Sequence, residues 1–380
     1  MDDVCKQIYK SSDFGEQLDK QSYFKEDITN LIQSANDDYS KVALIFTFVK
    51  QKVNWNGYYN YFVEKGVKRA YKDGSGNIAE IKLMLTSMLR FAGLNANPVL
   101  VSTRSNGVPI FPTLNGFDYV ITKVNFSDNT YILLDASEKY SFPNILPERC
   151  LNWSGRELLE NATSTLVNLV PKKHSQEIHT LHLKLNDDLT ANGMLRTSYS
   201  NHFALFYRDQ YNDKKEEDQI TRLENKYNVE IDDYNILNKN DLSKKIVQSF
   251  KFTSSDLIEE INGKVYITPL LFLAKKENPF KTNERNFPID FTLPIEQKYS
   301  VSIAIPEGYT IESAPENLAI GLPENLGVFK YQVSQDGSKI RVIAQFQINT
   351  HIISPEYYTT LKDFYRQLVT KQTEKIVVVK

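Results

Sequence analysis

The sequence has few of the residues that thiol, disulfide or metal chemistry requires. Only two of its 380 residues are cysteines, Cys5 and Cys150, and their separation fits neither a disulfide framework nor a zinc motif. The five histidines all lie at or after His174. Residues 1–173 therefore contain no cysteine–histidine pair that could act as nucleophile and base, whatever the alignment.

The sequence also lacks a strong net charge and a long apolar run. Its 45 basic and 47 acidic residues give a net charge of -2 without a long basic segment, so we expect no binding to nucleic acid. No stretch reaches the roughly 18 apolar residues that a membrane span needs, and the polar start Met1–Lys6 has no signal-peptide pattern. With 41% hydrophobic and 24% charged residues, the composition is that of a folded globular protein.

The first third of the sequence has the pattern of helices followed by strands. Apolar residues recur at three- and four-residue steps from Val42 to Val53, which predicts a helix with one buried face. A second, more apolar helix is expected from Ala79 to Ala92, and Gly93 fits the position after a helix end. Strands are expected after this helix at 97–103, 117–125 and 130–134.

Alternating apolar and polar residues dominate the rest of the sequence and predict a β-rich second domain. The alternation begins near Ile178 and favours a β-sandwich-like arrangement. A charged helical insertion is expected at about 201–226 and a closing helix at about 355–373. The fold class is therefore α+β, with three expected segments: an N-terminal helical segment or linker at 1–25, a first domain at 26–173 and the β-rich domain at 174–380.

Four blocks of the first domain resemble the core of the bacterial transglutaminase-like superfamily. In that family a Gly-x-Cys turn opens a buried helix and a Gly-Ile-x-Ala-type step leads into the sheet, and the blocks Gly76–Lys82 and Gly93–Val99 are similar to these features. Phe117–Ile121 and Tyr131–Ser137 follow where the family has its histidine and aspartate strands. The resemblance implies a papain-like, transglutaminase-core fold in which a helix packs on an antiparallel sheet.

A closer resemblance is to large bacterial proteins of unknown function, often exported, in which such a domain precedes a C-terminal β-domain. The blocks Val99–Arg104, Leu146–Asn152 and Phe287–Phe291 look typical of that group, and the resemblance extends over about residues 25–380. It implies a periplasmic or otherwise exported location. It also implies that this sequence lacks an N-terminal domain that relatives have.

The resemblance places unsuitable residues at two of the three catalytic positions. Enzymes of the superfamily use a cysteine thiolate at a helix N-terminus, a histidine as base and an aspartate that orients it. In this sequence Ile78, Tyr119 and Asp135 stand at those three positions. Isoleucine has no lone pair, and a phenol with a pKa near 10 is a poor proton shuttle at neutral pH. We therefore expect a chain without transglutaminase, amidase or cysteine protease activity.

A hydrolase with another nucleophile is the alternative. Ser75 lies in a Gly-Ser-Gly turn before a helix, where its hydroxyl could be exposed, but the domain offers no histidine to activate it. Glu80 and Asp135 could form an acid pair if the helix start faces the sheet. The simpler interpretation is that Asp135 accepts a hydrogen bond from Tyr119 while Glu80 pairs with a nearby base.

Neither a metal nor another cofactor is indicated. His179 and His182 lie three residues apart, which places them on opposite faces of the strand expected there. The 22 tyrosines and 21 phenylalanines fit a packed β-rich core. Trp55, Tyr58 and Tyr59 precede the helix that opens at the lost cysteine, and they either pack in the core or line a groove for a sugar ring or a peptide.

Two kinds of function follow from these patterns, and the sequence leaves both open. One is a non-catalytic module whose old cleft is reused to bind a peptide, a protein or a glycan. The other is a scaffold in which the old cleft is filled by side chains. Candidate binding residues around the cleft are Trp55, Tyr58, Tyr59, Ser75 and Glu80. An open cleft lined by exposed aromatic rings would favour binding, and a cleft plugged by tyrosine or phenylalanine would favour the scaffold.

Overall fold

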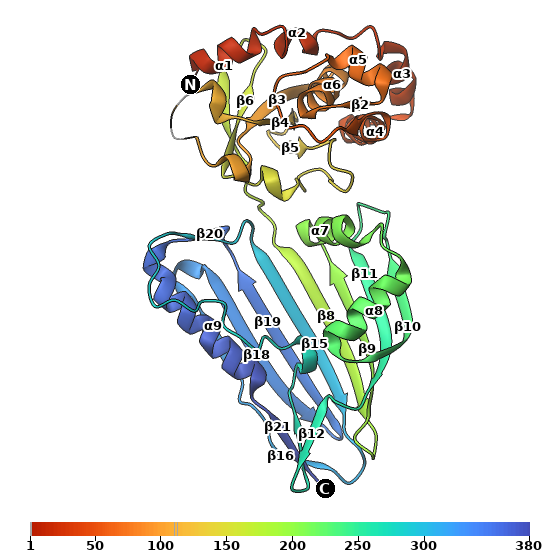
Figure 1. Ribbon diagram of the computed structural model, residues 1–380, viewed down its shortest axis with the longest axis vertical. Helices are drawn as coiled ribbons and strands as arrows, with labels where there is room; N and C mark the ends of the chain where they lie inside the picture. Colours follow the sequence, from red (N-terminus) through yellow and green to blue (C-terminus); the bar gives the residue numbers. More distant parts are fainter. Residues whose placement is uncertain (1, 110, 112) are drawn as a thin grey trace. The chain divides into compact units, whose positions relative to one another are not determined.

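The chain forms two compact units in the computed structural model, which describes residues 2–109, 111 and 113–380 (Figure 1). The first unit is Met1–Pro171 and the second is Lys172–Lys380. The division lies two residues before the boundary expected from the sequence. No helix within the described ranges has both the length and the apolar character that crossing a membrane requires.

The N-terminal segment is part of the first unit and does not act as a linker. Ile8, Phe14 and Phe24 are buried, and the hydroxyl of Ser87 donates a hydrogen bond of 2.6 Å to the carbonyl of Leu18. The segment is helical, as expected, and its apolar residues face the rest of the first unit. Its helices are α1 (Asp2–Tyr9), α2 (Gly15–Leu18), α3 (Lys25–Leu31) and the 3-10 turn η1 (Ile32–Ser34).

Three further helices complete the helical layer, and the cap residues in the sequence explain where two of them begin. The carboxylate of Asp37 accepts the backbone N–H of Ser40 at 2.7 Å, which caps α4. Asn77 and Glu80 form a reciprocal capping box at the start of α6, and Gly93, with φ 84°, follows its end. Both helices predicted from the apolar periodicity are confirmed. The bounds are α4 (Asp38–Lys52), α5 (Val67–Asp73) and α6 (Ile78–Phe91).

A five-stranded antiparallel sheet faces α6, and the order of its strands is β5-β4-β3-β6-β7. Helix α6 packs against β3 and β4, which gives the expected helix-on-sheet core. The bounds are β3 (Asn95–Val101), β4 (Tyr119–Asn125), β5 (Tyr131–Leu134), β6 (Ser154–Leu158) and β7 (Ser164–Asn168), with the short parallel pair β1 (Asn54–Trp55) and β2 (Ser75–Gly76) and the 3-10 turns η2 (Arg104–Asn106), η3 (Leu114–Gly116) and η4 (Glu148–Cys150).

The second unit is built on an eight-stranded sheet in the order β10-β11-β9-β8-β15-β19-β18-β17. Strands β8 and β15 pair in parallel, and the other neighbours pair antiparallel. The β-rich character predicted from the alternation is therefore confirmed. The bounds are β8 (Ser175–Leu185), β9 (Ala191–Tyr199), β10 (Glu230–Leu237), β11 (Ile246–Ser254), β15 (Ile295–Ala304), β17 (Leu318–Gly321), β18 (Gly327–Asp336) and β19 (Lys339–Ile348).

The layer against this sheet combines helices with a small four-stranded sheet, so only part of it is sandwich-like (Figure 1). The helical insertion expected at about 201–226 is confirmed as α7 and α8, and the expected closing helix is α9. One further strand, β21, follows α9. The bounds are α7 (His202–Tyr211), α8 (Glu216–Tyr227), α9 (Tyr358–Thr373), β12 (Ile258–Ile261), β13 (Lys264–Ile267), β14 (Ile289–Asp290), β16 (Thr310–Ser313), β20 (Ile352–Ile353), β21 (Ile376–Val379), η5 (Leu271–Leu273), η6 (Pro323–Asn325) and η7 (Pro355–Tyr357).

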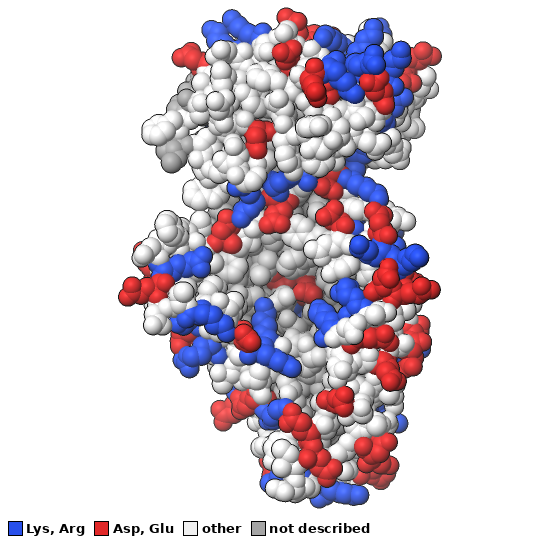
Figure 2. Space-filling model, in the orientation of Figure 1, with Lys and Arg blue, Asp and Glu red and all other residues white. Residues whose placement is uncertain are grey.

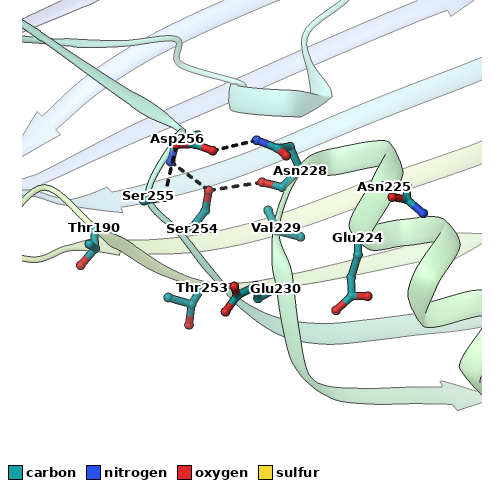
Figure 3. A pocket seen from close by; sticks show the side chains of 10 residues that line it. All are labelled: Thr190, Glu224, Asn225, Asn228, Val229, Glu230, Thr253, Ser254, Ser255 and Asp256. Atoms are coloured by element: carbon teal, nitrogen blue, oxygen red, sulfur yellow. Dashed lines mark hydrogen bonds between the residues drawn. The ribbon is translucent and has the colours of Figure 1, made fainter.

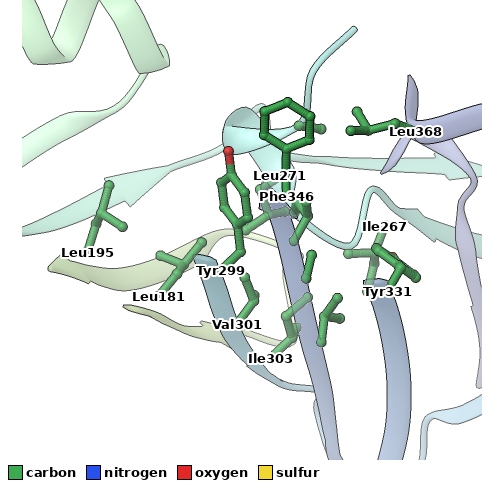
Figure 4. Close-up of a cluster of buried hydrophobic side chains, with 14 of the residues drawn as sticks. Leu181, Leu195, Ile267, Leu271, Tyr299, Val301, Ile303, Tyr331, Phe346 and Leu368 are labelled. Atoms are coloured by element: carbon green, nitrogen blue, oxygen red, sulfur yellow. The ribbon is translucent and has the colours of Figure 1, made fainter. Parts of the chain in front are cut away.

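The core of the second unit lies between these two layers (Figure 4). Alternate residues of each central strand point into it, as Leu181 and Phe346 do, and meet Leu368 of α9 and Ile267 of β13. Each such side chain contributes about 1.5–3 kcal/mol when fully buried. The intervening residues, such as His182, lie on the opposite, exposed face of the sheet.

Candidate functional site

The three positions selected by the resemblance lie at the ends of neighbouring elements in the first unit. Ile78 is the first residue of α6, Tyr119 is the first residue of β4, and Asp135 directly follows β5. Strand β4 pairs with β5, and α6 packs on β4. All three residues are 0% exposed. The three positions that the resemblance selects are thus closed to solvent.

The carboxylate of Asp135 is saturated with hydrogen bonds. Its Oδ2 accepts the hydroxyl of Tyr119 at 2.7 Å, which confirms the bond expected from the sequence. Its Oδ1 accepts the backbone N–H and the hydroxyl of Ser137 at 3.0 and 2.7 Å. The same oxygen also accepts a bond from the ammonium of Lys82. No free carboxylate oxygen is left to orient a proton shuttle.

Lys82 is the partner of Asp135 that the sequence reasoning missed. Its side chain is completely buried and forms an ion pair with Asp135. A signal existed, because residues 78 and 82 of one helix are four apart and therefore lie on the same face. Burial of a charge is costly unless it is paired. The lysine thus compensates the buried charge of Asp135.

The electrostatics of this pair agree with an ionised Asp135. Burial alone would raise the pKa of Asp135, but the cations of Lys82 and Arg149 and the bonds from Lys82 and Ser137 hold that pKa below its usual value. Burial lowers the pKa of Lys82, and the charge of Asp135 opposes this effect. The carboxylate is therefore an anion fixed by its neighbours and not a proton acceptor.

Arg149 and two aromatic rings cover the buried pair. The guanidinium donates through Nε to the hydroxyl of Tyr119 at 3.2 Å and through Nη1 to Glu138 at 3.1 Å. It also lies 5.1 Å from the ring centroid of Trp55 and 5.6 Å from that of Tyr119. The ring of Tyr59 lies 5.7 Å from that of Tyr119. These contacts cover Lys82 and Asp135, both of which are fully buried.

Cys150 lies at the same cluster without the environment of a nucleophile. Its thiol is fully buried and its Sγ is 3.6 Å from Oδ2 of Asp135. Burial and the neighbouring carboxylate raise the pKa of this thiol well above its ordinary value. A reactive cysteine needs the opposite effect, a pKa lowered toward neutrality in an accessible position.

Neither alternative catalytic group, Ser75 or Glu80, has a hydrogen bond to a basic side chain among the described residues. Ser75 lies in β2, and among the described residues its hydroxyl has no hydrogen bond to a base. Glu80 was expected to pair with a base, and this expectation is wrong. Its carboxylate accepts the backbone N–H of Asn77 at 2.8 Å and those of residues 64–66 at 3.3, 2.7 and 3.0 Å. As the third residue of a capped helix it faces backbone amides, so an acid pair with Asp135 is not supported.

The aromatic cluster before α6 divides into core residues and an exposed loop. Tyr58 and Tyr59 are 68% and 47% exposed, whereas Trp55 is partly buried, and its ring centroid lies 5.2 Å from that of Tyr59. Hydrogen bonds within the loop fix its shape. The indole of Trp55 donates to the carbonyl of Tyr58 at 3.1 Å, and the side chain of Asn56 accepts the N–H of Tyr58 at 3.1 Å. The ring positions are therefore set before any ligand arrives.

The histidines do not form a metal site. His179 lies on the buried face of β8, where its Nδ1 is 3.0 Å from the hydroxyl of Thr197 and its ring stacks on Tyr299. His182 lies on the exposed face, as the spacing predicted. Over the part of the chain that the structure describes, no group of three or more histidine, cysteine, aspartate or glutamate side chains is placed to hold a metal ion.

An acidic hollow of about 540 Å³ lies in the second unit beside the end of α8 (Figure 3). The hydroxyl of Ser254 donates to the carbonyl of Asn228 at 3.3 Å, and the amide of Asn228 donates to Asp256 at 3.1 Å. These bonds join the loops around the hollow, and we assign it no ligand. Acidic and basic side chains alternate over the face of the molecule that Figure 2 shows, which agrees with the small net charge.

Comparison with a solved structure supports the fold. The chain is similar to the structure described as "a putative protease from Parabacteroides distasonis ATCC 8503", with 12% sequence identity and a TM-score of 0.55. The similarity covers 99% of this chain and 58% of the other, so the chain spans little more than half of that protein's length. At this identity the likeness concerns the fold alone. No curated protein sequence matches the chain.

Comparison with protein families gives two matches, one in the first unit and one in the second. Residues 26–136 match the transglutaminase-like superfamily. Residues 263–378 match a domain of unknown function with solved structures, DUF3858. The first match contains Ile78, Tyr119 and Asp135. The chain therefore carries a transglutaminase-like superfamily domain followed by a DUF3858 domain, as the resemblance in its sequence predicted.

Proposed function

We propose that the first unit is a non-catalytic transglutaminase-like module and that the chain acts by binding or as a scaffold. The observation that supports this most is the bonding of Asp135. Where an enzyme would need this acid to orient a histidine, it is held by Lys82 and Tyr119 in a region that solvent does not reach. In this proposal, Lys82 and Tyr119 take the place of the catalytic histidine as partners of Asp135. They stabilise its carboxylate but do not provide a nucleophile.

The exposed loop 54–60 is the part of this module that we propose as its binding surface. It presents Tyr58 and Tyr59 to solvent and contains three asparagines but no charged residue. Tyrosine rings on a fixed backbone give a large contact area at a small loss of conformational entropy, and asparagines add hydrogen bonds. We therefore propose an uncharged surface of a peptide, protein or glycan as the ligand, met in the periplasm or outside the cell.

The absence of catalysis is tested with the purified full chain. Assays of amide hydrolysis and of amine transfer to glutamine should give rates equal to those without protein. A rate above this background that disappears when Cys150 is alkylated under conditions that keep the protein folded would show that the module is an enzyme. A rate that survives alkylation but is lost in Ser75→Ala would instead establish the hydrolase alternative.

The binding surface is tested by removing an exposed ring. Arrays of glycans and of peptides are probed with the full chain and with Tyr58→Ala. Loss of a buried tyrosine contact at an interface weakens binding by roughly 10-fold to 30-fold. Tyr39→Ala is the matched control, because Tyr39 is also exposed, at 54%, but lies on α4 against Phe126. If Tyr58→Ala binds like the unchanged chain, the loop is not the binding surface and the scaffold role is favoured.

A further inference from the structure

A basic hollow of about 380 Å³ lies on the exposed face of the eight-stranded sheet, in the second unit. Its basic lining consists of His182 of β8, Arg196 of β9 and Lys245, which directly precedes β11. None of its lining residues is acidic. The volume is at the lower end of the range of small-molecule sites, roughly 300–1,000 Å³. It lies in the other unit from the loop 54–60, so it is independent of the function proposed for that loop.

The three basic side chains have no partner within the described chain. The structure contains no ion pair or side-chain hydrogen bond of His182, Arg196 or Lys245 with any residue that it describes. Two other cations on the same face do have acidic partners: Lys251 lies 3.1 Å from Asp233, and Lys298 lies 2.9 Å from Glu296. The positive charge of this face is therefore unbalanced at the hollow.

The strand register keeps acidic residues away from the hollow. Thr180 pairs across the sheet with Ser300, His182 with Ser302, and Arg196 with Ser249. Side chains that are opposite one another on paired strands share a face. Uncharged serines therefore lie beside the basic residues on both neighbouring strands. No acidic side chain at these paired positions competes with an incoming anion for the cations.

The remaining lining residues add hydroxyl groups and an apolar floor. Thr180 and Ser198 supply two hydroxyls, and Ile178 and Met194 supply apolar surface. A small concave site of this kind fixes a charged group through a few polar contacts while the apolar part of the ligand packs on its floor. Both halves of such a ligand are thus accommodated within the hollow.

We propose that this hollow binds a small phosphate monoester whose apolar group rests on Ile178 and Met194. A guanidinium matches two phosphate oxygens at once, and an ammonium adds a point charge. Two permanent cations, Arg196 and Lys245, fit the nearly double charge of a phosphate monoester at neutral pH. A carboxylate has only a single charge and leaves one of the two cations without a partner.

The ligand class is tested by calorimetric titration of the full chain with phenyl phosphate and with benzoate, which share the ring and differ in the charged group. Phenyl phosphate should bind with a Kd on the order of 1 mM, at least about tenfold more tightly than benzoate. Binding should weaken as salt is raised, because the site is solvent-exposed. Equal binding of benzoate, or no phosphate binding up to 20-fold above that rough concentration, would overturn the proposal.

Variants separate this site from the general charge of the surface. Arg196→Ala and Lys245→Ala should each weaken binding of phenyl phosphate by about tenfold, and Lys245 is an exposed residue outside the strands, so its removal does not threaten the fold. The matched control is Lys330→Ala, which removes one exposed cation from β18 of the same sheet, away from the hollow. An equal loss in the control would mean that binding is non-specific, and the proposal would be wrong.

A phosphate monoester can be free or can be the headgroup of a lipid. Sedimentation of the full chain with vesicles containing phosphatidic acid distinguishes these sources. If the chain binds phenyl phosphate but does not sediment with the vesicles, the ligand is a soluble ester. Sedimentation that Lys245→Ala abolishes and Lys330→Ala retains assigns the same hollow to a lipid headgroup. Failure of both probes contradicts the site.

Discussion

At the scale of single residues, the positions that the family resemblance selects form a compact polar cluster. Tyr119, at the position where the resemblance expects a histidine, donates a hydrogen bond to Asp135, which the sequence could predict from the order of the blocks. The spacing of Lys82 from Ile78 indicated the helix face on which the lysine lies, but not that its side chain is buried and paired with Asp135. Only the fold shows that the lysine ammonium reaches across to the carboxylate. Lys82 and Asp135 are 53 positions apart in the sequence, so their ion pair depends on the tertiary structure.

The bond between Tyr119 and Asp135 can be measured as a coupling energy. Tyr119→Phe should lower the free energy of unfolding by about 1–3 kcal/mol, because a buried acceptor loses a donor. Chemical denaturation of Tyr119→Phe, Asp135→Asn and the double variant gives the coupling. Since the phenol and carboxylate are 2.7 Å apart, the effects should not be additive. Strict additivity would mean that the pair contributes no interaction energy.

His202 should make the second unit sensitive to acid. Burial lowers its pKa to about 4, and neither ring nitrogen has a partner among the described residues. The unfolded chain takes up this proton near pH 6.5, so the free energy of unfolding should fall as the pH drops from about 6.5 to about 4. The loss is at most roughly 3 kcal/mol.

Denaturation of the unchanged chain and of His202→Phe at pH 7 and pH 4.5 measures this contribution. The variant should lose less stability between the two pH values. His182→Phe is the control, since that ring is exposed on the sheet. Equal acid sensitivity in the unchanged chain and in His202→Phe would show that another group takes up the proton.

At the scale of elements, local sequence signals predicted the helices well, but they did not predict which distant strands pair. Both ends of α6 lie within one residue of those expected. Helix α4 ends one residue before Val53 but begins four residues before Val42, directly after its cap Asp37. The alternation gave strands, but not the parallel pairing of β8 with β15, which are separated by more than 100 residues and by both inserted helices. Pairing at that distance depends on how the whole unit closes.

The two edge strands of the large sheet, β10 and β17, have features that oppose pairing with another chain. The sequence alone did not show that these strands are edges. Strand β10 carries a register shift between Ile231 and Asp233, and β17 has only four residues. Acidic side chains lie along β10, where Asp233 pairs with Lys251. Bulges, short edges and charges all oppose pairing with another chain. The edge strands are therefore built to end the sheet.

Glu80 joins the start of α6 to the loop that precedes it. Its carboxylate accepts four backbone N–H groups, three of them from the preceding loop at residues 64–66. Glu80→Ala should therefore cost more than an ordinary cap, about 2–4 kcal/mol in the free energy of unfolding. The control is Asp37→Ala, which removes the exposed cap of α4 and should cost about 1 kcal/mol.

Two measurements test this role of Glu80. Chemical denaturation compares the two alanine variants, and hydrogen exchange follows the amides of residues 64–66. These amides should lose protection in Glu80→Ala and keep it in Asp37→Ala. Similar costs for both variants, with unchanged exchange at residues 64–66, would show that other contacts hold the loop.

At the scale of the whole molecule, two domains of different construction follow one another. The sequence predicted this organisation because its periodicity changes from helical to alternating, and the observed boundary at residue 171 is two residues from the expected one. What it could not supply was the make-up of the layer that covers the large sheet. That layer draws on segments as distant as β13 and α9, which meet only through burial of their apolar faces.

Because the second unit has a hydrophobic core of its own, a fragment of residues 172–380 should fold alone. Its core joins Phe346 of the sheet, Leu368 of α9 and Ile267 of β13, all within the fragment. We expect a single cooperative thermal transition, and Phe346→Ala should lower the free energy of unfolding by about 3–5 kcal/mol. Ile343→Ala, on the same strand but exposed, should cost less than about 1 kcal/mol. A fragment that shows no cooperative transition would mean that this core does not suffice to hold the domain together.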